Sequence, residues 1–278
     1  MGKVLIAMSG GVDSSVAAYL LKHSGWDCVG ATMTLYRNED IGISRSRTCC
    51  SLEDVEDARS VAFRLRIPYY VFNFSDEFRR QVMDRFADAY GQGRTPNPCI
   101  DCNRYLKFRH LYDRAALLGC DTIATGHYAR IERENGRYLL KKALDASKNQ
   151  SYVLYMLTQE QLAHTQFPLG ALRKAETRQL ADSLGFFNAR KPDSQDICFV
   201  PDGDYAAFIR RHSGKADTPG DFVDESGRIL GRHRGIAHYT IGQRKGLGIP
   251  SNQPLYVKAI DPKSNQVVLS GNDALFSQ

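Results

Sequence analysis

The stretch KVLIAMSGGVDSS, residues 3–15, joins a short apolar run to a glycine-rich turn. Apolar residues then recur with helical spacing from Val16 to Leu21, so the pattern predicts a strand over residues 3–8 and a helix over Asp13–His23. In such a strand–turn–helix unit, backbone N–H groups and the positive end of the helix dipole converge on one point. The stretch therefore predicts an α/β fold with an anion site directly after its first strand.

The alternation of strand and helix continues over the next hundred residues. Runs rich in β-branched and aromatic residues predict strands, and the segments between them show helical spacing. The predicted strands are Val29–Met33, Tyr69–Phe72 and Thr122–Thr125, and the predicted helices are Leu52–Leu65, Asp76–Tyr90 and Arg104–Leu118. This alternation predicts a parallel sheet with helices on both faces, which binds ligands at the carboxyl ends of its strands.

The character of the sequence changes near its last third. Residues 145–185 are expected to be mainly helical, with Gly185 just beyond the last helix. Later residues predict a helix over Tyr205–His212 and then short alternating runs, such as Leu255–Ile260 and Gln266–Leu269, between Gly, Pro and Asn. The expected domains are an α/β domain over residues 1–200 and a small β-rich domain over residues 201–278.

The composition permits an anionic partner without requiring one. The 278 residues carry 37 Lys and Arg against 31 Asp and Glu, a formal net charge of +6, and no basic tail that would wrap RNA nonspecifically. The N-terminus lacks the pattern of a signal peptide, and no stretch approaches the roughly 20 apolar residues needed to cross a bilayer. We therefore expect a cytoplasmic protein without a membrane partner.

Two interpretations of SGGVDSS, residues 9–15, compete. The stretch lacks the Gly-Lys-Ser/Thr ending of a Walker A loop and the spacing of a dinucleotide fingerprint, so one interpretation is an ordinary turn with Asp13 as helix N-cap. The other is a different nucleotide site, because the seven residues resemble the PP-loop of ATP pyrophosphatases, which cleave ATP between its α- and β-phosphates. The resemblance implies that the loop holds pyrophosphate and that Asp13 helps to organise Mg²⁺.

The seven cysteines favour metal or redox chemistry over a disulfide framework, because their number is odd and several are clustered. GRTPNPCIDCN, residues 93–103, is a proline-restrained loop that brings Cys102 to the start of the helix expected from Arg104. A thiol at a helix N-terminus, beside Arg104 and Lys107, should be biased toward thiolate. Cys198 by itself is more typical of a buried apolar residue. The alternative for the cluster is a zinc site with Cys49, Cys50, Cys99 and Cys102 as ligands.

Several other residues have a structural interpretation beside a functional one. Cys28 and Cys120 lie among apolar residues and are expected to be buried thiols, and His127 is expected to be a structural partner rather than a base. A basic stripe beside Cys102 fits either a phosphate backbone or a solvated helix face. The stripe consists of Arg94, Arg104, Lys107 and Arg109, and a further RNA contact is expected from Gln243, Arg244 and Lys245.

Six motifs in this order resemble the family of tRNA-specific 2-thiouridylases: SGGVDSS, GRTPNPCIDCN, ATGHYAR, KNQSYVLY, DSQDICF and TIGQRKGLG. The resemblance covers nearly the whole chain and implies an adenine-nucleotide alpha-hydrolase-like fold, with residues 1–200 as a PP-loop ATP pyrophosphatase catalytic domain. It implies that ATP adenylates C2 of the wobble uridine in tRNA and that sulfur then replaces AMP, giving 2-thiouridine and pyrophosphate. Cys198 would accept a persulfide sulfur from a cysteine desulfurase or relay protein, and Cys102 would assist its release and end in a disulfide with Cys198.

The resemblance also assigns binding residues one by one and assigns no metal-ligand set. The implied nucleotide-binding residues are Ala7, Met8, Ser9, Gly10, Gly11, Val12, Asp13, Ser14, Met33 and Gly126. The implied tRNA-binding residues are Asn97, Pro98 and Cys99 in a target-base loop, and Lys148, Asn149 and Gln150 at a second contact.

Two departures from the family keep alternatives open. Some relatives carry Asp where this chain has Cys99, and the family continues into a C-terminal β-barrel that we expect to be absent here. Three thiolates from Cys99, Cys102 and Cys198 would suit an iron–sulfur cluster, which is the alternative to a persulfide. A zinc-binding RNA module without catalysis, and a PP-loop ligase acting on a small amide or carboxylate, are the remaining alternatives.

Overall fold

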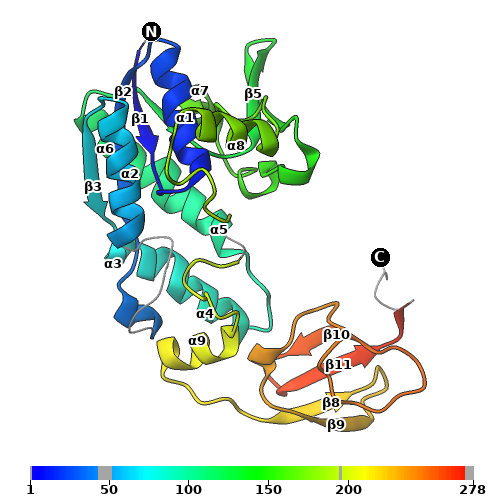
Figure 1. Cartoon of the computed structure of the whole chain (residues 1–278). Helices are drawn as coiled ribbons and strands as arrows, with labels where there is room; N and C mark the ends of the chain where they lie inside the picture. Colours follow the sequence, from blue (N-terminus) through cyan, green and yellow to red (C-terminus); the bar gives the residue numbers. More distant parts are fainter. Residues whose placement is uncertain (1, 43–51, 194–195, 273–278) are drawn as a thin grey trace. The chain divides into compact units, whose positions relative to one another are not determined.

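The computed structural model describes residues 2–42, 52–193 and 196–272 (Figure 1). The described residues divide into two compact units, each with its own sheet. The first unit takes the residues described within Met1–Asn38, Ile43–Gln81 and Cys99–Phe199, and the second those within Glu39–Gly42, Val82–Pro98 and Val200–Gln278.

The first unit contains a parallel sheet, as the sequence predicts. Its strand order is β3-β2-β1-β4-β7, and each neighbouring pair runs parallel, with Leu5 opposite both Val29 and Ile123. The strands are β1 Lys3–Ala7, β2 Asp27–Thr34, β3 Tyr69–Asn73, β4 Thr122–Thr125 and β7 Thr165–Gln166. The last strand is too short to be recognised in sequence. The antiparallel hairpin of β5 Ala129–Glu134 and β6 Arg137–Lys142 was not predicted, although the Asn135-Gly136 turn that joins its strands is a hairpin signal.

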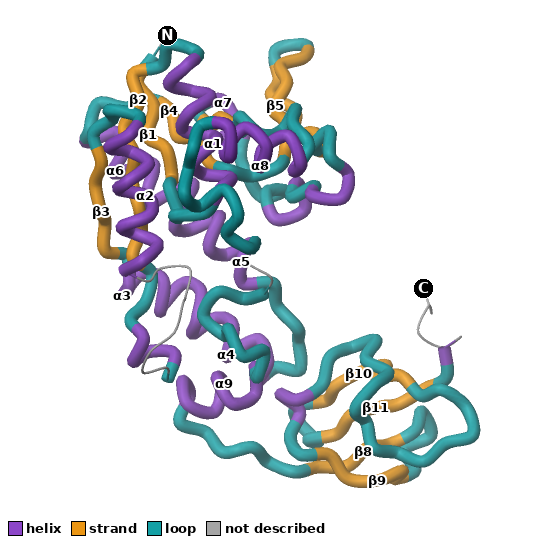
Figure 2. Tube along the Cα trace, viewed as in Figure 1, coloured by secondary structure: helices purple, strands orange, loops and turns teal. Residues whose placement is uncertain are grey.

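Helices bury the sheet because its central strand is apolar on both faces. Val4 and Ile6 alternate with Leu5, and all three are fully buried. The first two lie in one apolar core with residues of α1, α2 and α8, while α6 packs against β4. The α/β layering expected from the alternating pattern is therefore confirmed (Figure 2).

The helical elements follow the predicted order, with π-helical turns inside two of the predicted helices. The segment 145–185 is less helical than expected, because it holds two three-residue 3-10 turns, the five-residue helix α7 and the ten-residue helix α8 among loops. Gly185 does end α8, with φ of +63°. The elements are α1 Val12–His23, η1 Asn38–Ile41, α2 Leu52–Arg64, α3 Ser75–Phe78, η2 Arg79–Met83, α4 Asp84–Gly91, α5 Pro98–Asp101, η3 Cys102–His110, α6 Leu111–Leu117, η4 Ala146–Lys148, η5 Ser151–Val153, α7 Gln159–Ala163, α8 Lys174–Ser183, α9 Tyr205–Ser213 and η6 Ile236–His238.

The second unit is β-rich and has its own apolar core around Phe222 and Val257, both fully buried. Its sheet has the strand order β10-β11-β8-β9. The predicted helix is present as α9, which Asp204 caps by accepting a hydrogen bond from the Ala207 N–H at 2.9 Å. The strands are β8 Gly220–Val223, β9 Ile229–His233, β10 Tyr256–Asp261 and β11 Gln266–Ser270.

The helices of the described residues are all too short or too polar to cross a membrane.

Candidate active site

The phosphate loop lies between β1 and α1, where the sequence places it. Gly10 has φ of +73°, and a Cβ on it would approach the Asp54 carbonyl oxygen to 2.5 Å, so both the backbone conformation and the space require glycine. Gly11 is the N-cap and α1 begins at Val12. The N–H groups of the first turn of α1 therefore face the loop, as an anion site requires.

Short hydrogen bonds fix the shape of this loop. The Ser14 hydroxyl donates to the Gly11 carbonyl at 3.0 Å and accepts from the Ser9 N–H at 3.1 Å. Asn188 donates from Nδ2 to the Gly10 carbonyl and to the Ser15 hydroxyl, both at 2.9 Å, and is 2% exposed. Sequence alone gave no signal for Asn188, because it lies 178 residues from the loop that it supports.

Gly126 meets the phosphate loop directly. A Cβ on Gly126, just after β4, would lie 2.8 Å from the Ser14 backbone nitrogen, so only glycine fits beside the first turn of α1. Met33 is half-buried at the end of β2, whereas Met8 is 2% exposed within the apolar core and can offer a nucleotide only its backbone. Because β1, β2 and β4 run parallel, these candidate nucleotide residues gather at one carboxyl edge of the sheet.

Asp13 is paired with a buried cation that the sequence analysis missed. The Lys174 ammonium lies 2.7 Å from each oxygen of Asp13, and the lysine is only 8% exposed. The Tyr128 hydroxyl donates to Asp13 Oδ1 at 2.9 Å, and the Thr177 hydroxyl lies 3.0 Å from the Tyr128 hydroxyl oxygen. Burial and the adjacent Asp13 carboxylate raise the pKa of Tyr128, so it remains a neutral donor. Tyr128 belongs to the quoted ATGHYAR motif, whereas nothing in the sequence marked Lys174.

Asp193 lies at the centre of a cation cluster. It accepts from Lys174 and Arg178 at 2.7 Å and from Lys148 at 2.9 Å. Partial burial alone would raise the pKa of Asp193, but the hydrogen bonds and charges of Lys174 and Lys148 outweigh it and lower the pKa to about 2. Lys148, which the resemblance assigns to tRNA, is therefore already part of an ion pair within the chain.

Asn149 and Gln150 use their side-chain oxygens to shape the turn that carries them. Asn149 Oδ1 accepts from the N–H groups of Ala143 and Ser151, at 3.2 and 3.3 Å. Gln150 Oε1 accepts from the Tyr128 N–H at 2.9 Å. Any base contact by these two residues would therefore come from their amide nitrogens.

Cys198 is held next to the segment that leaves the carboxyl end of β2. The Tyr36 hydroxyl donates to the Cys198 carbonyl at 2.6 Å, and Tyr36 follows β2 by two residues. The next residue, Phe199, is 1% exposed and packs edge-on against Phe78 with ring centroids 5.6 Å apart. The side chain of Cys198 is half-buried, so this cysteine is not the fully buried apolar residue that its local sequence favours.

The helix start predicted near Arg104 is wrong, and with it the structure loses the basis for expecting a Cys102 thiolate. The helical run begins at Pro98 and not near Arg104, so Cys102 lies about one turn inside it, and the influence of a helix N-terminus fades within the first turn. Burial raises the pKa of the Cys102 thiol to about 11 and outweighs the lowering effect of Lys107. The adjacent Asn103 fixes this region by donating from Nδ2 to the Val153 carbonyl at 3.0 Å.

The residues given a structural interpretation from sequence behave as expected. Cys28 and Cys120 are 1% and 3% exposed, and burial raises the pKa of both thiols, to about 11 for Cys28. His127 is buried with Nδ1 2.7 Å from the Thr125 hydroxyl, and burial lowers its pKa well below the usual value.

In the basic stripe, the guanidinium of Arg104 lies 5.9 Å from the ring centroid of Tyr105.

The metal alternatives find no support among the described residues. Within 2–42, 52–193 and 196–272, no three or more His, Cys, Asp or Glu side chains are arranged to hold a metal ion. Cys99, Cys102 and Cys198, which are all among these residues, are not gathered into such a group. Cys49 and Cys50, the other ligands of the zinc alternative, lie outside the described residues.

Comparison with known proteins identifies the family. A family model described as "tRNA methyl transferase HUP domain" matches residues 2–202, and one described as "tRNA methyl transferase PRC-barrel domain" matches residues 206–271. The chain is 54% identical over 279 residues to "tRNA-specific 2-thiouridylase MnmA" of Lachnoclostridium phytofermentans, covering 100% of this chain and 78% of that protein. The chain belongs to the MnmA family. The MnmA protein of Clostridioides difficile is 52% identical over 278 residues, covering 99% of this chain and 77% of its own length.

A solved structure described as a 4-thiouridine synthetase–RNA complex with bound ATP is similar at 22% identity, with a TM-score of 0.49. It matches 72% of this MnmA-family chain and 45% of the synthetase chain.

Proposed function

We propose that this chain transfers sulfur to C2 of the wobble uridine of tRNA, in a reaction that consumes ATP and releases AMP and pyrophosphate. The MnmA relatives are named as tRNA-specific 2-thiouridylases and align over essentially the whole chain. The observation that carries the proposal is that the phosphate loop and Cys198 both lie beyond the carboxyl ends of neighbouring parallel strands. The phosphate loop follows β1, and the Cys198 main chain lies beside the segment that leaves the neighbouring strand β2.

The first half-reaction is adenylation of the uridine. The C2 oxygen attacks the α-phosphorus of ATP and pyrophosphate leaves, which converts a poor leaving group into AMP. The N–H groups of the phosphate loop, at the N-terminus of α1, suit the negative charge of the departing pyrophosphate. Gly10 and Gly126, where a side chain would clash with neighbouring backbone, let the loop pack against Asp54 and the end of β4 pack against the first turn of α1.

Mg²⁺ fits this site through Asp13, whose carboxylate stands at the loop and is 32% exposed. When bound, Mg²⁺ would neutralise charge on the leaving pyrophosphate. Lys174 competes for the same two oxygens, so its ammonium would be available to a phosphate whenever Asp13 turns to the metal.

The second half-reaction delivers sulfur. The terminal sulfur of a Cys198 persulfide, supplied by a cysteine desulfurase or relay protein, attacks the adenylated C2 and expels AMP. Cys102 then loses its proton and attacks Cys198 Sγ. The persulfide S–S bond breaks, the outer sulfur stays on C2 as the thiocarbonyl, and a Cys102–Cys198 disulfide remains for an external thiol to reduce. The raised pKa of Cys102 means that this last step needs a base to take its proton.

The family descriptions name a second chemistry, methyl transfer, which the site supports less well. Methylation of tRNA consumes a methyl donor and does not require cleavage of ATP next to a pair of cysteines. The phosphate loop and the placement of Cys198 beside the end of β2 both favour thiolation.

The test is an assay of the purified chain with unmodified tRNA, ATP, Mg²⁺ and either sulfide or a persulfide donor. We expect mass spectrometry of the digested nucleosides to find 2-thiouridine, formed in proportion to AMP. Cys198→Ser should abolish the persulfide-supported reaction. A methylated nucleoside, or no ATP consumption, would overturn the proposal. Sulfide-supported activity with tightly held iron would replace the persulfide scheme by a cluster.

The domain division stays part of this proposal. We assign adenylation and sulfur transfer to residues 1–200 and an accessory tRNA contact to residues 201–278, with Gln243, Arg244 and Lys245 as its candidates.

A further inference from the structure

Three residues of the segment 188–193, which leads to Cys198, tie it to the rest of its unit. Asn188 donates to the carbonyl of Gly10 in the phosphate loop at 2.9 Å. The Lys191 ammonium lies 2.6 Å from each of two carboxylates on α2. Asp193 accepts from three cations within 2.9 Å. These contacts hold residues 188–193 against the phosphate loop, α2 and α8.

Lys174 joins this segment to the nucleotide site through a single buried charge. Its ammonium lies 2.7 Å from both oxygens of Asp13 and 2.7 Å from Asp193 Oδ1. A lysine that is 8% exposed is tolerated only when its charge is paired, and here two carboxylates pair it. One carboxylate belongs to the phosphate loop, and the other precedes Cys198 by five residues.

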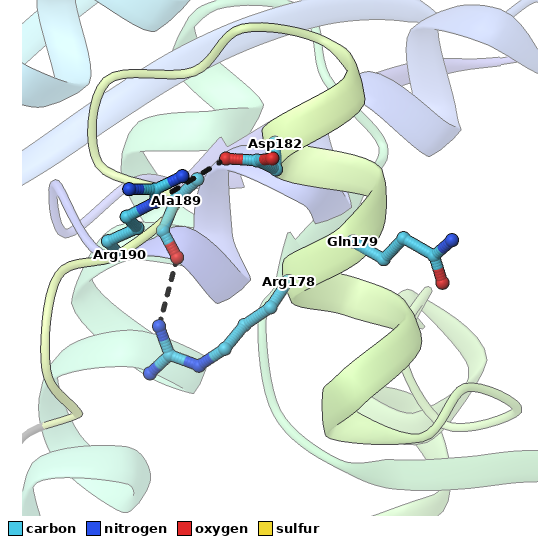
Figure 3. Close-up of a pocket in the computed structure, with 5 residues that line it drawn as sticks. All are labelled: Arg178, Gln179, Asp182, Ala189 and Arg190. Carbon is cyan, nitrogen blue, oxygen red and sulfur yellow. Dashed lines mark hydrogen bonds and ion pairs between the residues drawn. The ribbon is translucent and has the colours of Figure 1, made fainter.

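The Arg178 side chain holds the backbone of the same segment. It donates to the carbonyl of Ala189 at 2.9 Å (Figure 3). It also donates to the carbonyl of Lys191 at 3.0 Å and to Asp193 Oδ1 at 2.7 Å. Arg190 is different, because its side chain is 91% exposed and its ion pair with Asp182 is long, at 3.7 Å. Both arginines line a pocket of about 420 Å³ beside α8, but only Arg178 reaches Asp193.

The anchor at Asp193 limits where Cys198 can lie. Five residues span at most about 18 Å when fully extended. The far end of this short stretch is fixed as well, because Tyr36 donates to the Cys198 carbonyl at 2.6 Å. Cys198 is therefore reached from two anchors, one of which shares its cation with Asp13.

We propose that Asp193 is a positioning residue. Through Lys174, Lys148 and Arg178 it fixes residues 188–193 against the phosphate loop, and so it limits where Cys198 can lie and brings sulfur to the place where the adenylate forms. The proposal rests on the thiolation function proposed above. We call Asp193 with Lys148, Lys174 and Arg178 the clamp. Lys148 therefore belongs first to the clamp and only second to a tRNA contact.

The test compares Asp193→Asn, Asp193→Glu and Arg190→Gln in the full chain. Adenylation is followed as AMP and pyrophosphate formed from ATP and tRNA, sulfur transfer as 2-thiouridine, and the position of Cys198 as its alkylation rate by iodoacetamide. For Asp193→Asn we expect adenylation within about threefold of wild type and sulfur transfer slower by about tenfold to a hundredfold, because small misplacements of a reacting group cost that much. Cys198 should be alkylated faster, Asp193→Glu should recover part of both effects, and Arg190→Gln should match wild type.

Equal slowing of adenylation and sulfur transfer would overturn the positioning role, as would unchanged sulfur transfer and unchanged alkylation. The alkylation rate needs no substrate. A chain that fails to thiolate tRNA but shows faster alkylation of Cys198 only in Asp193→Asn would therefore contradict the proposed function and leave the clamp standing.

Discussion

The phosphate loop and the two cysteines are held by different kinds of contact. Ser14 and Ser15 both donate to the carbonyl of Gly11, so most of the hydrogen bonds that shape the loop lie within seven residues, and Asn188 adds one remote support. The carbonyl of Cys198 depends on a tyrosine 162 positions away, and the residue after Cys102 depends on a carbonyl 50 positions away. Substitutions within the phosphate loop should therefore disturb it most, whereas the cysteines can be displaced by substitutions far away in the sequence.

The largest effect should come from a substitution within the phosphate loop. Gly10→Ala forces a side chain into φ of +73° and against the Asp54 carbonyl, so we expect a loss of about 2–5 kcal/mol in unfolding free energy and at least about a hundredfold in adenylation. The matched change is Gly11→Ala, where φ is −83° and the nearest heavy atom would be 3.6 Å away. It should cost less than about 1 kcal/mol. Equal losses in urea unfolding of the two variants would show that the loop does not require its left-handed residue.

The next effect concerns the chemical state of Cys102. Its pKa of about 11 lies above the ordinary value of 9.0, so its thiolate fraction near pH 8 should be about a hundredfold smaller than that of an ordinary cysteine. We expect iodoacetamide to label Cys102 slowly at pH 8, with a rate that rises about tenfold per pH unit up to pH 10. Peptide mass spectrometry on Cys198→Ser provides the measurement. A rate that levels off between pH 8 and 9 would restore the reactive thiolate expected from sequence.

The smallest effect is a pH dependence of stability at Asp193. Its folded pKa of about 2 is below the ordinary 3.8, so its contribution is complete above about pH 4 and is lost as the pH falls through 2. Asp193→Asn should therefore lower the unfolding free energy by about 2 kcal/mol at pH 7, and the difference should shrink below pH 4. Asp182→Asn, which removes an exposed carboxylate 3.7 Å from Arg190, should change it by less than about 0.5 kcal/mol. A difference that stays constant from pH 7 to 2.5 would contradict the ion-pair account.

The contrast between local and remote contacts explains how much the sequence could predict. The parallel sheet, the phosphate loop and the glycine after α8 follow from periodicity and from glycines whose backbone needs are local. Because β1 and β4 are parallel neighbours, Gly126 at the carboxyl end of β4 also lies against the first turn of α1, at the edge of the sheet where ligands are expected.

The remaining site residues could not be found in this way. Lys174 lies at the start of α8, where a lysine usually faces solvent, and only the tertiary fold buries it between two carboxylates. Asn188 has no motif around it. The difference at Cys102 came from the helix boundary, since the helical run begins at Pro98 and the half-buried cysteine lies inside the run and not just before its start.

The central claim is that the phosphate loop activates the C2 oxygen of the uridine so that a sulfur beside β2 can replace it. Its most direct test is a single turnover on tRNA that carries ¹⁸O at C2 of the target uridine, followed by mass spectrometry of AMP. We predict that the ¹⁸O appears in the phosphate of AMP as 2-thiouridine forms, and that Cys198→Ser stops both in the persulfide-supported reaction. Recovery of the ¹⁸O in water or pyrophosphate, with 2-thiouridine still formed, would contradict the account.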